Sequence, residues 1–195
     1  MRRFVFVMTA LIFFMAGQAL AADNQVKAVL KIKSDISNVL KGIEKTISYA
    51  AKETGKPDLL READMRKLLQ GCNAGRSYVI DSAFVDNRGI MKFIEPQQYR
   101  KHEGSNIAGQ EAVANMMKIR KPWMGNAFVS VEGIKSIDIE YPVFSKDKQF
   151  LGSISMLIKH DELIRSAAGK TEKERGVNCM VMQKDGLILY KTDQT

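Results

Sequence analysis

Residues 24–53 carry one continuous apolar stripe at helical spacing. Successive members are three or four residues apart, and the lysines between them fall on the other side of a 3.6-residue turn. The stripe consists of Val29, Ile32, Ile36, Val39, Ile43 and Ile47. This pattern predicts a long amphipathic helix. Gly55 and Pro57 are expected to end it, because glycine accepts a left-handed cap and proline cannot continue the hydrogen-bond ladder. A second helix is expected from Asp58, as its N-cap, to about Gln70.

The centre of the chain changes to the two-residue alternation of β-strands. Strands are expected at 78–85, 90–94, 126–132, 134–144 and 150–158. The first two flank Asp86-Asn-Arg-Gly89, where Gly and Asn tolerate the positive φ of a tight turn. Gln110 to about Lys118 reads as a short helix. The turns between 78–85 and 90–94, and between the last three strands, are short, and turns this short join antiparallel neighbours. We therefore expect an α+β fold, with an antiparallel sheet of about five strands and the long helix packed on it.

The last three of these strands alternate in phase. Ser136, Asp138 and Glu140 fall opposite Ile137, Ile139 and Tyr141, and Ser153 and Ser155 fall opposite Ile154 and Met156. In the strand at 126–132, Asn126, Phe128, Ser130 and Glu132 share one face. One face of the sheet is therefore polar. An antiparallel sheet with one solvated face is the ordinary explanation.

Beyond the sheet, residues 159–168 are expected to form a helix and 169–176 a charged loop. A hairpin is expected around Lys184-Asp-Gly186.

The N-terminus has the three parts of a secretory signal. Arg2 and Arg3 precede an apolar stretch, and Ala19-Leu-Ala21 has the small residues of a cleavage site. Residues 1–21 are thus expected to be a signal peptide, and the mature protein is expected in the periplasm or outside the cell. The alternative is a membrane tether formed by an uncleaved N-terminal anchor. The apolar stretch of about 14 residues is short for the roughly 20 that span a bilayer.

Charge and cysteine content narrow the partners further. The formal net charge is +8, but the lysines are scattered and no aromatic platform accompanies them, so no nucleic acid is expected as a partner. Cys72 and Cys179 are the only cysteines. An oxidising compartment permits a disulfide between them, and two reduced, partly buried thiols are the alternative.

Catalytic and metal-binding motifs are missing from the sequence. His102 and His160 lack metal-ligand neighbours at suitable spacing. Gly169-Lys-Thr171 resembles the end of a phosphate loop, but Ile164 stands where its first glycine is required. We expect no catalytic residues, no metal and no cofactor.

Several short segments, in this order and spacing, resemble the landmarks of Cache domains, which are extracytoplasmic PAS-like ligand sensors. The segments are Asp86-Asn-Arg-Gly89, Pro96-Gln-Gln-Tyr99, Gly104-Ser-Asn-Ile-Ala-Gly-Gln110, Lys121-Pro122, Glu132-Gly133, Tyr141-Pro-Val-Phe144 and Leu151-Gly-Ser-Ile-Ser155. The resemblance covers roughly residues 24–195. It implies four parts: the signal at 1–21, the long helix at 22–56, a ligand-binding core at 57–168, and a hairpin at 169–195 that opens a second, truncated module of a double-Cache sensor.

In such a fold the polar face of the sheet is roofed, so its polar groups line a ligand cavity. The ligand-binding residues expected from sheet and roof are Tyr99, Arg100, Gln110, Trp123, Asn126, Phe128, Ser130, Asp138 and Ser155. A Cache subgroup binds amino acids through an Arg-Trp-Tyr cluster and a late-strand Asp. This chain has Gln110-Glu-Ala112 and Leu157 at the corresponding places. A polar or anionic metabolite that engages Arg100 or the serines is expected instead.

The resemblance implies a non-catalytic small-molecule sensor that acts in signal transduction. Its expected partners are a small organic ligand, a second copy through residues 24–53, and a membrane-bound signalling protein. The alternative is a secreted structural or adaptor protein that associates through its long helix and has no small-molecule pocket.

Overall fold

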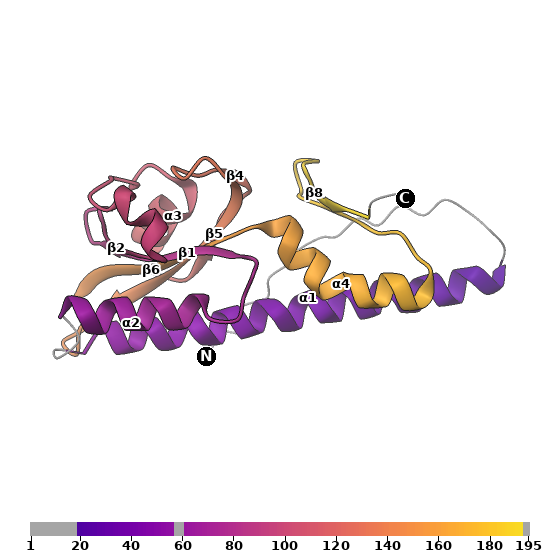
Figure 1. Ribbon diagram of the computed structural model, residues 1–195, viewed down its shortest axis with the longest axis horizontal. Coiled ribbons are helices and arrows are strands. Elements are labelled where there is room, and N and C mark those ends of the chain that lie inside the picture. Colours follow the sequence, from indigo (N-terminus) through magenta and orange to yellow (C-terminus); the bar gives the residue numbers. More distant parts are fainter. Residues whose placement is uncertain (1–18, 57–60, 193–195) are drawn as a thin grey trace. The chain divides into compact units, whose positions relative to one another are not determined.

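The computed structural model describes residues 19–56 and 61–192, which divide into two compact units (Figure 1). One unit comprises 41–56 and 61–160, and we call it the sheet unit. The other comprises 19–40 and 161–192, and we call it the hairpin unit. Nearly all of the expected signal peptide and the expected cap Asp58 lie outside the described residues.

The sheet unit is built on six antiparallel strands in the order β2-β1-β6-β5-β3, with β4 also paired to β5. The strands are β1 (Val79–Asp86), β2 (Met91–Glu95), β3 (Trp123–Met124), β4 (Phe128–Val129), β5 (Lys135–Phe144) and β6 (Phe150–Ile158). The predicted hairpin and the two long strands are confirmed, as is their antiparallel pairing. Gly152 allows β6 to approach β1 closely, since a Cβ there would lie 2.0 Å from the Val85 carbonyl oxygen.

The strand predicted at 126–132 is wrong in extent. The segment instead contributes the two-residue strands β3 and β4. The Asn126 backbone N–H donates to Glu111 Oε2. In the tight turn that follows, the Ser130 N–H donates to the Ile134 carbonyl and the Gly133 N–H donates to the Ser130 carbonyl. Backbone groups that are satisfied in these ways do not extend the ladder beside β5.

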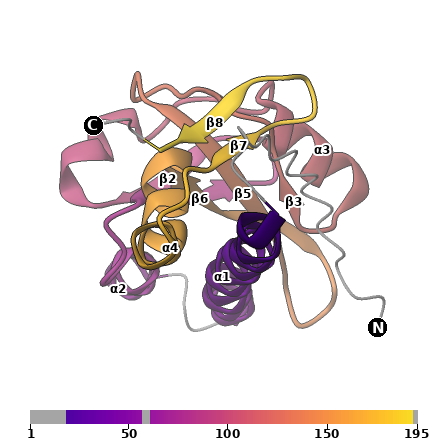
Figure 2. The same ribbon diagram turned by 90° about the vertical axis from the view of Figure 1, so that its right-hand side faces the viewer.

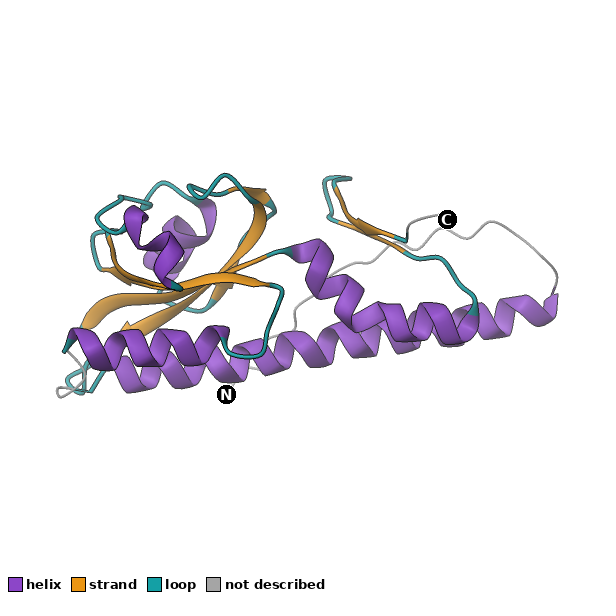
Figure 3. Cartoon of the chain, viewed as in Figure 1, coloured by secondary structure: helices purple, strands orange, loops and turns teal. Residues whose placement is uncertain are grey.

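Two helices cover one face of the sheet: α2 (Glu62–Asn73) and the second half of α1 (Ala19–Thr54) (Figures 1 and 3). In this unit α1 buries Ile43, Ile47 and Ala50, and α2 buries Met65, Leu69 and Cys72. The long helix is therefore confirmed. The second helix runs to Asn73 and not to Gln70, because Leu69 and Cys72 continue its apolar side past Gly71.

The opposite face lies beneath α3 (Glu111–Ile119) and the chain around the 3₁₀ helix η2 (Gln97–His102). A buried cluster joins the two layers, and Tyr99 of η2 packs against it. Its members are Ala83, Val85, Met91, Ile94, Ile107 and Val113. The helix predicted at 110–118 is confirmed, whereas η2 was not predicted.

The hairpin unit contains the first half of α1, α4 (His160–Arg175), β7 (Met180–Met182) and β8 (Ile188–Lys191) (Figure 2). The charged loop predicted at 169–176 is wrong. The helix continues through Gly169 because Thr171 and Glu172 are buried on the side already defined by Ala167 and Ala168. Within this unit α1 buries Ala28, Ile32 and Ile36, whereas Val29 and Val39 are half-buried.

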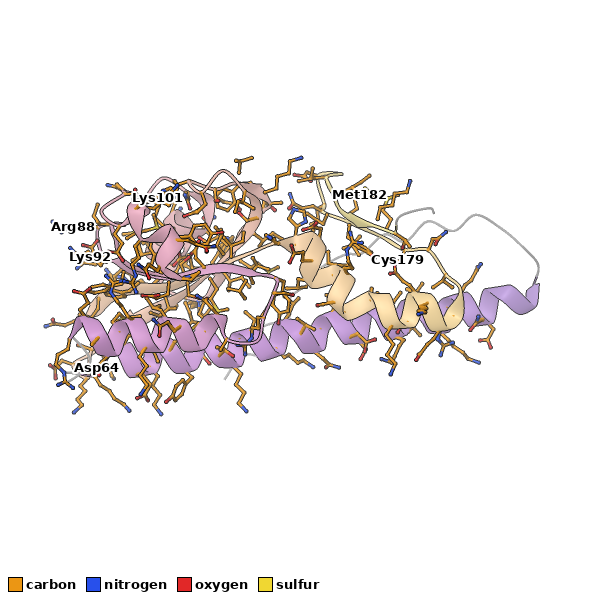
Figure 4. All side chains as sticks on the ribbon, viewed as in Figure 1. Asp64, Arg88, Lys92, Lys101, Cys179 and Met182 are labelled. Carbon is orange, nitrogen blue, oxygen red and sulfur yellow. The ribbon has the colours of Figure 1, made fainter. Side chains whose placement is uncertain are left out.

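A buried carboxylate fastens α4 to β8. Glu172 accepts hydrogen bonds from Tyr190 Oη (2.9 Å) and from Thr192 Oγ1. Cys179 of this unit (Figure 4) and Cys72 of the sheet unit are both free and buried, so the disulfide is not formed in this structure. Burial raises the pKa of Cys72 to about 11.

Candidate functional site

The face of the sheet beneath α3 carries a line of acidic and hydroxyl side chains. Residues that pair directly across strands have their side chains on the same face of the sheet. Glu140 of β5 pairs with Ser155 of β6, and Ser155 pairs with Ala83 of β1, so these three residues share one face. Side chains two residues apart on a strand also share a face. The same face therefore carries Asp138 and Glu140 of β5, Ser153 and Ser155 of β6, and Asp81 of β1. We call these five residues the acidic face.

Asp138 is the centre of the acidic face. Its side chain is buried, and Oδ1 accepts a hydrogen bond of 2.8 Å from Ser155 Oγ. The pKa of Asp138 is raised to about 6, chiefly by burial and also by the charge of Glu132, whereas hydrogen bonds with Ser155 and Glu140 lower it. The hydroxyl therefore offsets only part of the cost of placing this charge away from water.

Glu140 is fully buried, and neither of its carboxylate oxygens has a hydrogen-bond partner among the described residues. Burial raises its pKa well above the ordinary value, and the charge of Asp138 adds to that shift. Ser153 Oγ on the neighbouring strand and Trp123 Nε1 on β3 also lack partners, and Trp123 lies directly across from Glu140. Unpartnered polar atoms are uncommon in protein interiors, so their concentration here indicates a binding surface.

Asp81 extends the acidic face to a third strand. It is buried in the middle of β1, with Oδ2 unpartnered. Burial raises its pKa well above the ordinary value, with further contributions from the charges of Glu132 and Asp138. Glu132, half-buried in the turn after β4, thus lies near both aspartates.

The charged neighbours that shift the pKa of Asp81, Asp138 and Glu140 are other carboxylates, which raise it. Basic residues of this unit project elsewhere. Figure 4 shows Arg88, Lys92 and Lys101 at its outer edge, where all three are exposed. Across residues 19–56 and 61–192 there is also no group of three or more His, Cys, Asp or Glu arranged to hold a metal ion.

The structure brings several of the predicted ligand-binding residues together. Asp138 and Ser155 are hydrogen-bonded, and Trp123 pairs with Glu140. Phe128 pairs with Ser136, two residues from Asp138, and so shares its side of the sheet. Ser130 follows directly and is buried with Oγ unpartnered.

Other predicted residues lie apart from the acidic face. Asn126 is exposed, and Tyr99 packs against the apolar cluster described above. Gln110 is the N-cap residue of α3 and makes no side-chain capping bond.

Arg100 is engaged on the opposite side of the sheet. Its guanidinium donates to Glu95 Oε1 from Nε (3.1 Å) and from Nη2 (2.5 Å), and Glu95 pairs in register with Ser82. Arg66 of α2 also contacts Glu95 and donates to Glu103 Oε1 at 2.9 Å. We call Arg66, Glu95, Arg100 and Glu103 the Glu95 network. It joins the segment around η2 to α2.

The sequence prediction omitted Asp81, Glu140 and Ser153 from the ligand-binding residues. Glu140 and Ser153 were already on the predicted polar face, so the alternation of the two strands was enough to place them with Asp138 and Ser155. For Asp81 the available signal was a carboxylate within Tyr78-Val-Ile-Asp-Ser-Ala-Phe-Val85, an otherwise apolar strand.

The family model for the HK/GC/chemotaxis protein-like sensor domain matches residues 38–160, which is nearly all of the sheet unit. The chain belongs to this family of sensor domains. As a Cache-type sensor domain, it has the α+β fold, long N-terminal helix and antiparallel sheet that the sequence predicted.

Solved structures agree with that assignment. An extracellular ligand binding receptor from Desulfohalobium retbaense has 25% identity and a TM-score of 0.76 over 86% of this chain, which spans 31% of that receptor. The ligand-binding domain of Campylobacter jejuni chemoreceptor Tlp3, in complex with L-valine, has 14% identity and a TM-score of 0.70, covering 88% of this chain and 71% of that one. The Pseudomonas aeruginosa amino-acid chemoreceptor PctC, in complex with GABA, has 16% identity and a TM-score of 0.66, covering 90% and 76%.

Two further observations are negative: one concerns curated proteins and the other the helices of this structure. No protein of curated function matches this chain. Within the described residues, none of the helices combines the length and apolar character needed to span a bilayer.

Proposed function

We propose that the sheet unit binds a small organic ligand on its acidic face, beneath α3, and passes the occupied state to a signalling partner without catalysing a reaction. The observation that carries this proposal is the set of buried, unpartnered polar atoms on Asp81, Glu140, Ser153 and Trp123. A sheet with a solvated face would satisfy such atoms with water, whereas these lie under a helix and a loop.

The structural relatives support a ligand on this fold. The Tlp3 and PctC domains were solved with L-valine and with GABA, both small amino-acid ligands. Since related sensor domains of this kind face the outside of the cell, we also propose that this chain is exported and that residues 1–21 direct the export. A membrane-bound partner would then receive the signal.

The test is a thermal-shift screen of small metabolites against the full chain. A ligand at about 100 times its dissociation constant adds roughly 2.7 kcal/mol of stability, which is readily detected. Trp123→Ala and Ser155→Ala should abolish or weaken the shift, whereas Asn126→Ala, at an exposed position near the site, should preserve it. Hits that bind all three variants with wild-type affinity would refute this location. A broad screen without any hit would favour the adaptor function.

A second proposal concerns association through residues 24–53. Val26 and Leu30, one helical turn apart on α1, leave 57% and 59% of their surface exposed, and neighbouring large apolar side chains that are exposed commonly mark an interface. We propose that α1 pairs with a second copy of the chain. Sedimentation of the wild-type chain should show a dimer, and Leu30→Asp should shift it toward monomer.

A further inference from the structure

We propose that the ligand is an organic amine, protonated and without a carboxylate, whose ammonium group is bound by Asp81, Asp138 and Glu140. The inference rests on the ligand-binding function proposed above and specifies the chemistry that the acidic face selects. It replaces the expectation of an anionic ligand held by Arg100.

The three carboxylates surround one patch of the sheet. Asp81 and Asp138 both pair with Leu157, from the two strands that flank β6. Their Cα atoms are therefore two strand spacings apart, roughly 10 Å. Glu140 lies two residues along β5 from Asp138, roughly 7 Å away on the same face. Side chains of this length reach toward one another over the patch, and the mutual effects on their pKa values agree with that closeness.

Among the five residues of the acidic face, the hydroxyls of Ser153 and Ser155 are the donors, Ser155 already donates to Asp138, and none of the five carries a positive charge. Asp81 Oδ2 and both oxygens of Glu140 accept no hydrogen bond, and no ion pair is formed at Asp81, Asp138 or Glu140 in the part of the chain that the structure describes. A neutral polar ligand could supply hydrogen bonds but no positive charge to compensate an ionised carboxylate. A protonated amine supplies N–H donors and positive charge together, which is the combination that buried carboxylates require.

A metal ion fits this arrangement less well than an amine. Calcium and magnesium need several oxygens within about 2.0 to 2.6 Å of one point. The described residues contain no group of three or more acidic, His or Cys side chains that meets this requirement. An ammonium group directs its N–H bonds outward over a wider span, and so it suits carboxylates that come from two different strands.

Three arginines of the sheet unit are engaged away from the acidic face. Arg100 and Arg66 are held by Glu95 and Glu103 on the other side of the sheet. Arg120, at the end of α3, stacks on the ring of Phe150. An α-amino acid would therefore bring a negative charge next to the acidic face, whereas the amine formed by removing its carboxylate would not.

Protons should compete with the amine for the acidic face. The titratable groups near Asp138 are Asp81, Glu132 and Glu140, and the charged residues of α3 above it, Glu111 and Lys118, are exposed. Since the amine favours ionised carboxylates, its affinity should fall as the pH drops from 7.5 to 5.5.

The experiment is calorimetry on the full chain with matched pairs of probes that differ by one group. The pairs are L-valine with isobutylamine, L-ornithine with putrescine, and L-phenylalanine with phenethylamine. The fully N-acetylated derivative of each amine, diacetylated in the case of putrescine, serves as a neutral analogue. We expect one of the amines to bind at least tenfold more tightly than both its amino acid and its N-acetyl derivative.

Variants then connect this preference to the proposed carboxylates. Asp138→Asn and Glu140→Gln preserve shape and should each weaken amine binding at least tenfold, whereas Asp147→Asn, an exposed acid in the turn between β5 and β6, should not. Thermal melts show whether the variants are folded. Unchanged amine affinity in both variants, or tighter binding of the amino acids, would overturn the amine assignment while leaving the ligand-binding function intact. Binding by no probe and by no compound of the broader screen would overturn both.

Discussion

At the scale of single residues, the chain keeps two groups of buried acids in opposite electrostatic conditions. Glu95 is 2% exposed and is contacted by Arg66 and Arg100, so its charge is compensated. Asp138 and Glu140 are equally buried and have no such partner in the described part of the chain. Glu95 therefore supports the fold, whereas the acidic face costs stability until a ligand binds.

The first prediction concerns the pH dependence of stability without ligand. Burial raises the pKa of Asp138 to about 6, so the folded state holds this proton more tightly than the unfolded chain, whose Asp titrates near 3.9. The resulting stabilisation is fully present below about pH 4 and is lost as the pH rises through about 6. Asp138→Asn should therefore be more stable than wild type at pH 7.5, by on the order of 1 to 3 kcal/mol.

Urea unfolding between pH 4 and 8 measures this difference. The slope of unfolding free energy against pH should be smaller in Asp138→Asn than in wild type, and unchanged in Asp147→Asn. A less stable Asp138→Asn at pH 7.5 would mean that the ionised carboxylate is compensated after all.

The second prediction concerns the Glu95 network. Glu95→Ala removes the carboxylate that Arg66 and Arg100 share, while Arg66 keeps Glu103 and Glu62, so we expect a loss of about 1.5 to 3 kcal/mol. Arg88→Ala breaks an exposed pair with Asp86 and should cost less than about 1 kcal/mol. Chemical denaturation compares the two, and equal losses would contradict the contrast in burial.

At the scale of elements, the close approach of β6 to β1 depends on a glycine. Gly152 has φ of +139°, and an added Cβ would lie 2.0 Å from the Val85 carbonyl oxygen. Gly152→Ala must therefore separate two central strands, and we expect a loss of more than about 2 kcal/mol. Gly42→Ala is the matched control. This position in α1 has no atom within 4 Å of the added Cβ, so alanine should stabilise by up to about 1 kcal/mol. Thermal denaturation of the two variants decides whether the site, and not the residue type, sets the effect.

The elements that could be predicted from sequence are those whose side-chain period is uninterrupted. The stripe through Ile32, Ile43 and Ile47 gave α1, and the alternation along β5 gave the polar face. The two-residue alternation does not predict a strand correctly where backbone N–H groups are hydrogen-bonded to side chains or within turns. This is the case at Asn126 and Ser130, and there the predicted strand was too long.

The site was predicted only as far as it depends on alternation. Asp138 and Ser155 follow from strand parity, but Arg100 was misplaced because its direction depends on the 3₁₀ turn after β2. That turn brings Arg100 back to Glu95, five residues earlier at the end of β2, and the alternation of a strand does not describe such a turn. Asp81 was missed because the sequence of β1 is largely apolar. Only the register between β1 and β6, in which Asp81 pairs with Leu157, shows which face of the sheet Asp81 is on.

At the scale of the whole sheet unit, the two faces have different roles. The face under α1 and α2 is closed by apolar side chains such as Ile47, Leu69 and Ile154. The face under α3 combines an apolar cluster with the acidic face. Because apolar side chains are buried on both faces, the fold can keep the polar groups that we propose for ligand binding, although they weaken it.

The short strands β3 and β4 imply a route by which the ligand reaches the acidic face. The Glu95 network fastens the segment around η2 to α2, whereas β3 and β4 contain two residues each, and Val129 of β4 is 63% exposed. Hydrogen exchange should therefore be faster in residues 123–134 than in β6, and a bound ligand should slow it. Equal protection in both segments would place the entrance elsewhere. If the route is correct, the opening of two very short strands sets how quickly the sensor fills and empties, and with it the shortest change in concentration that the cell can follow.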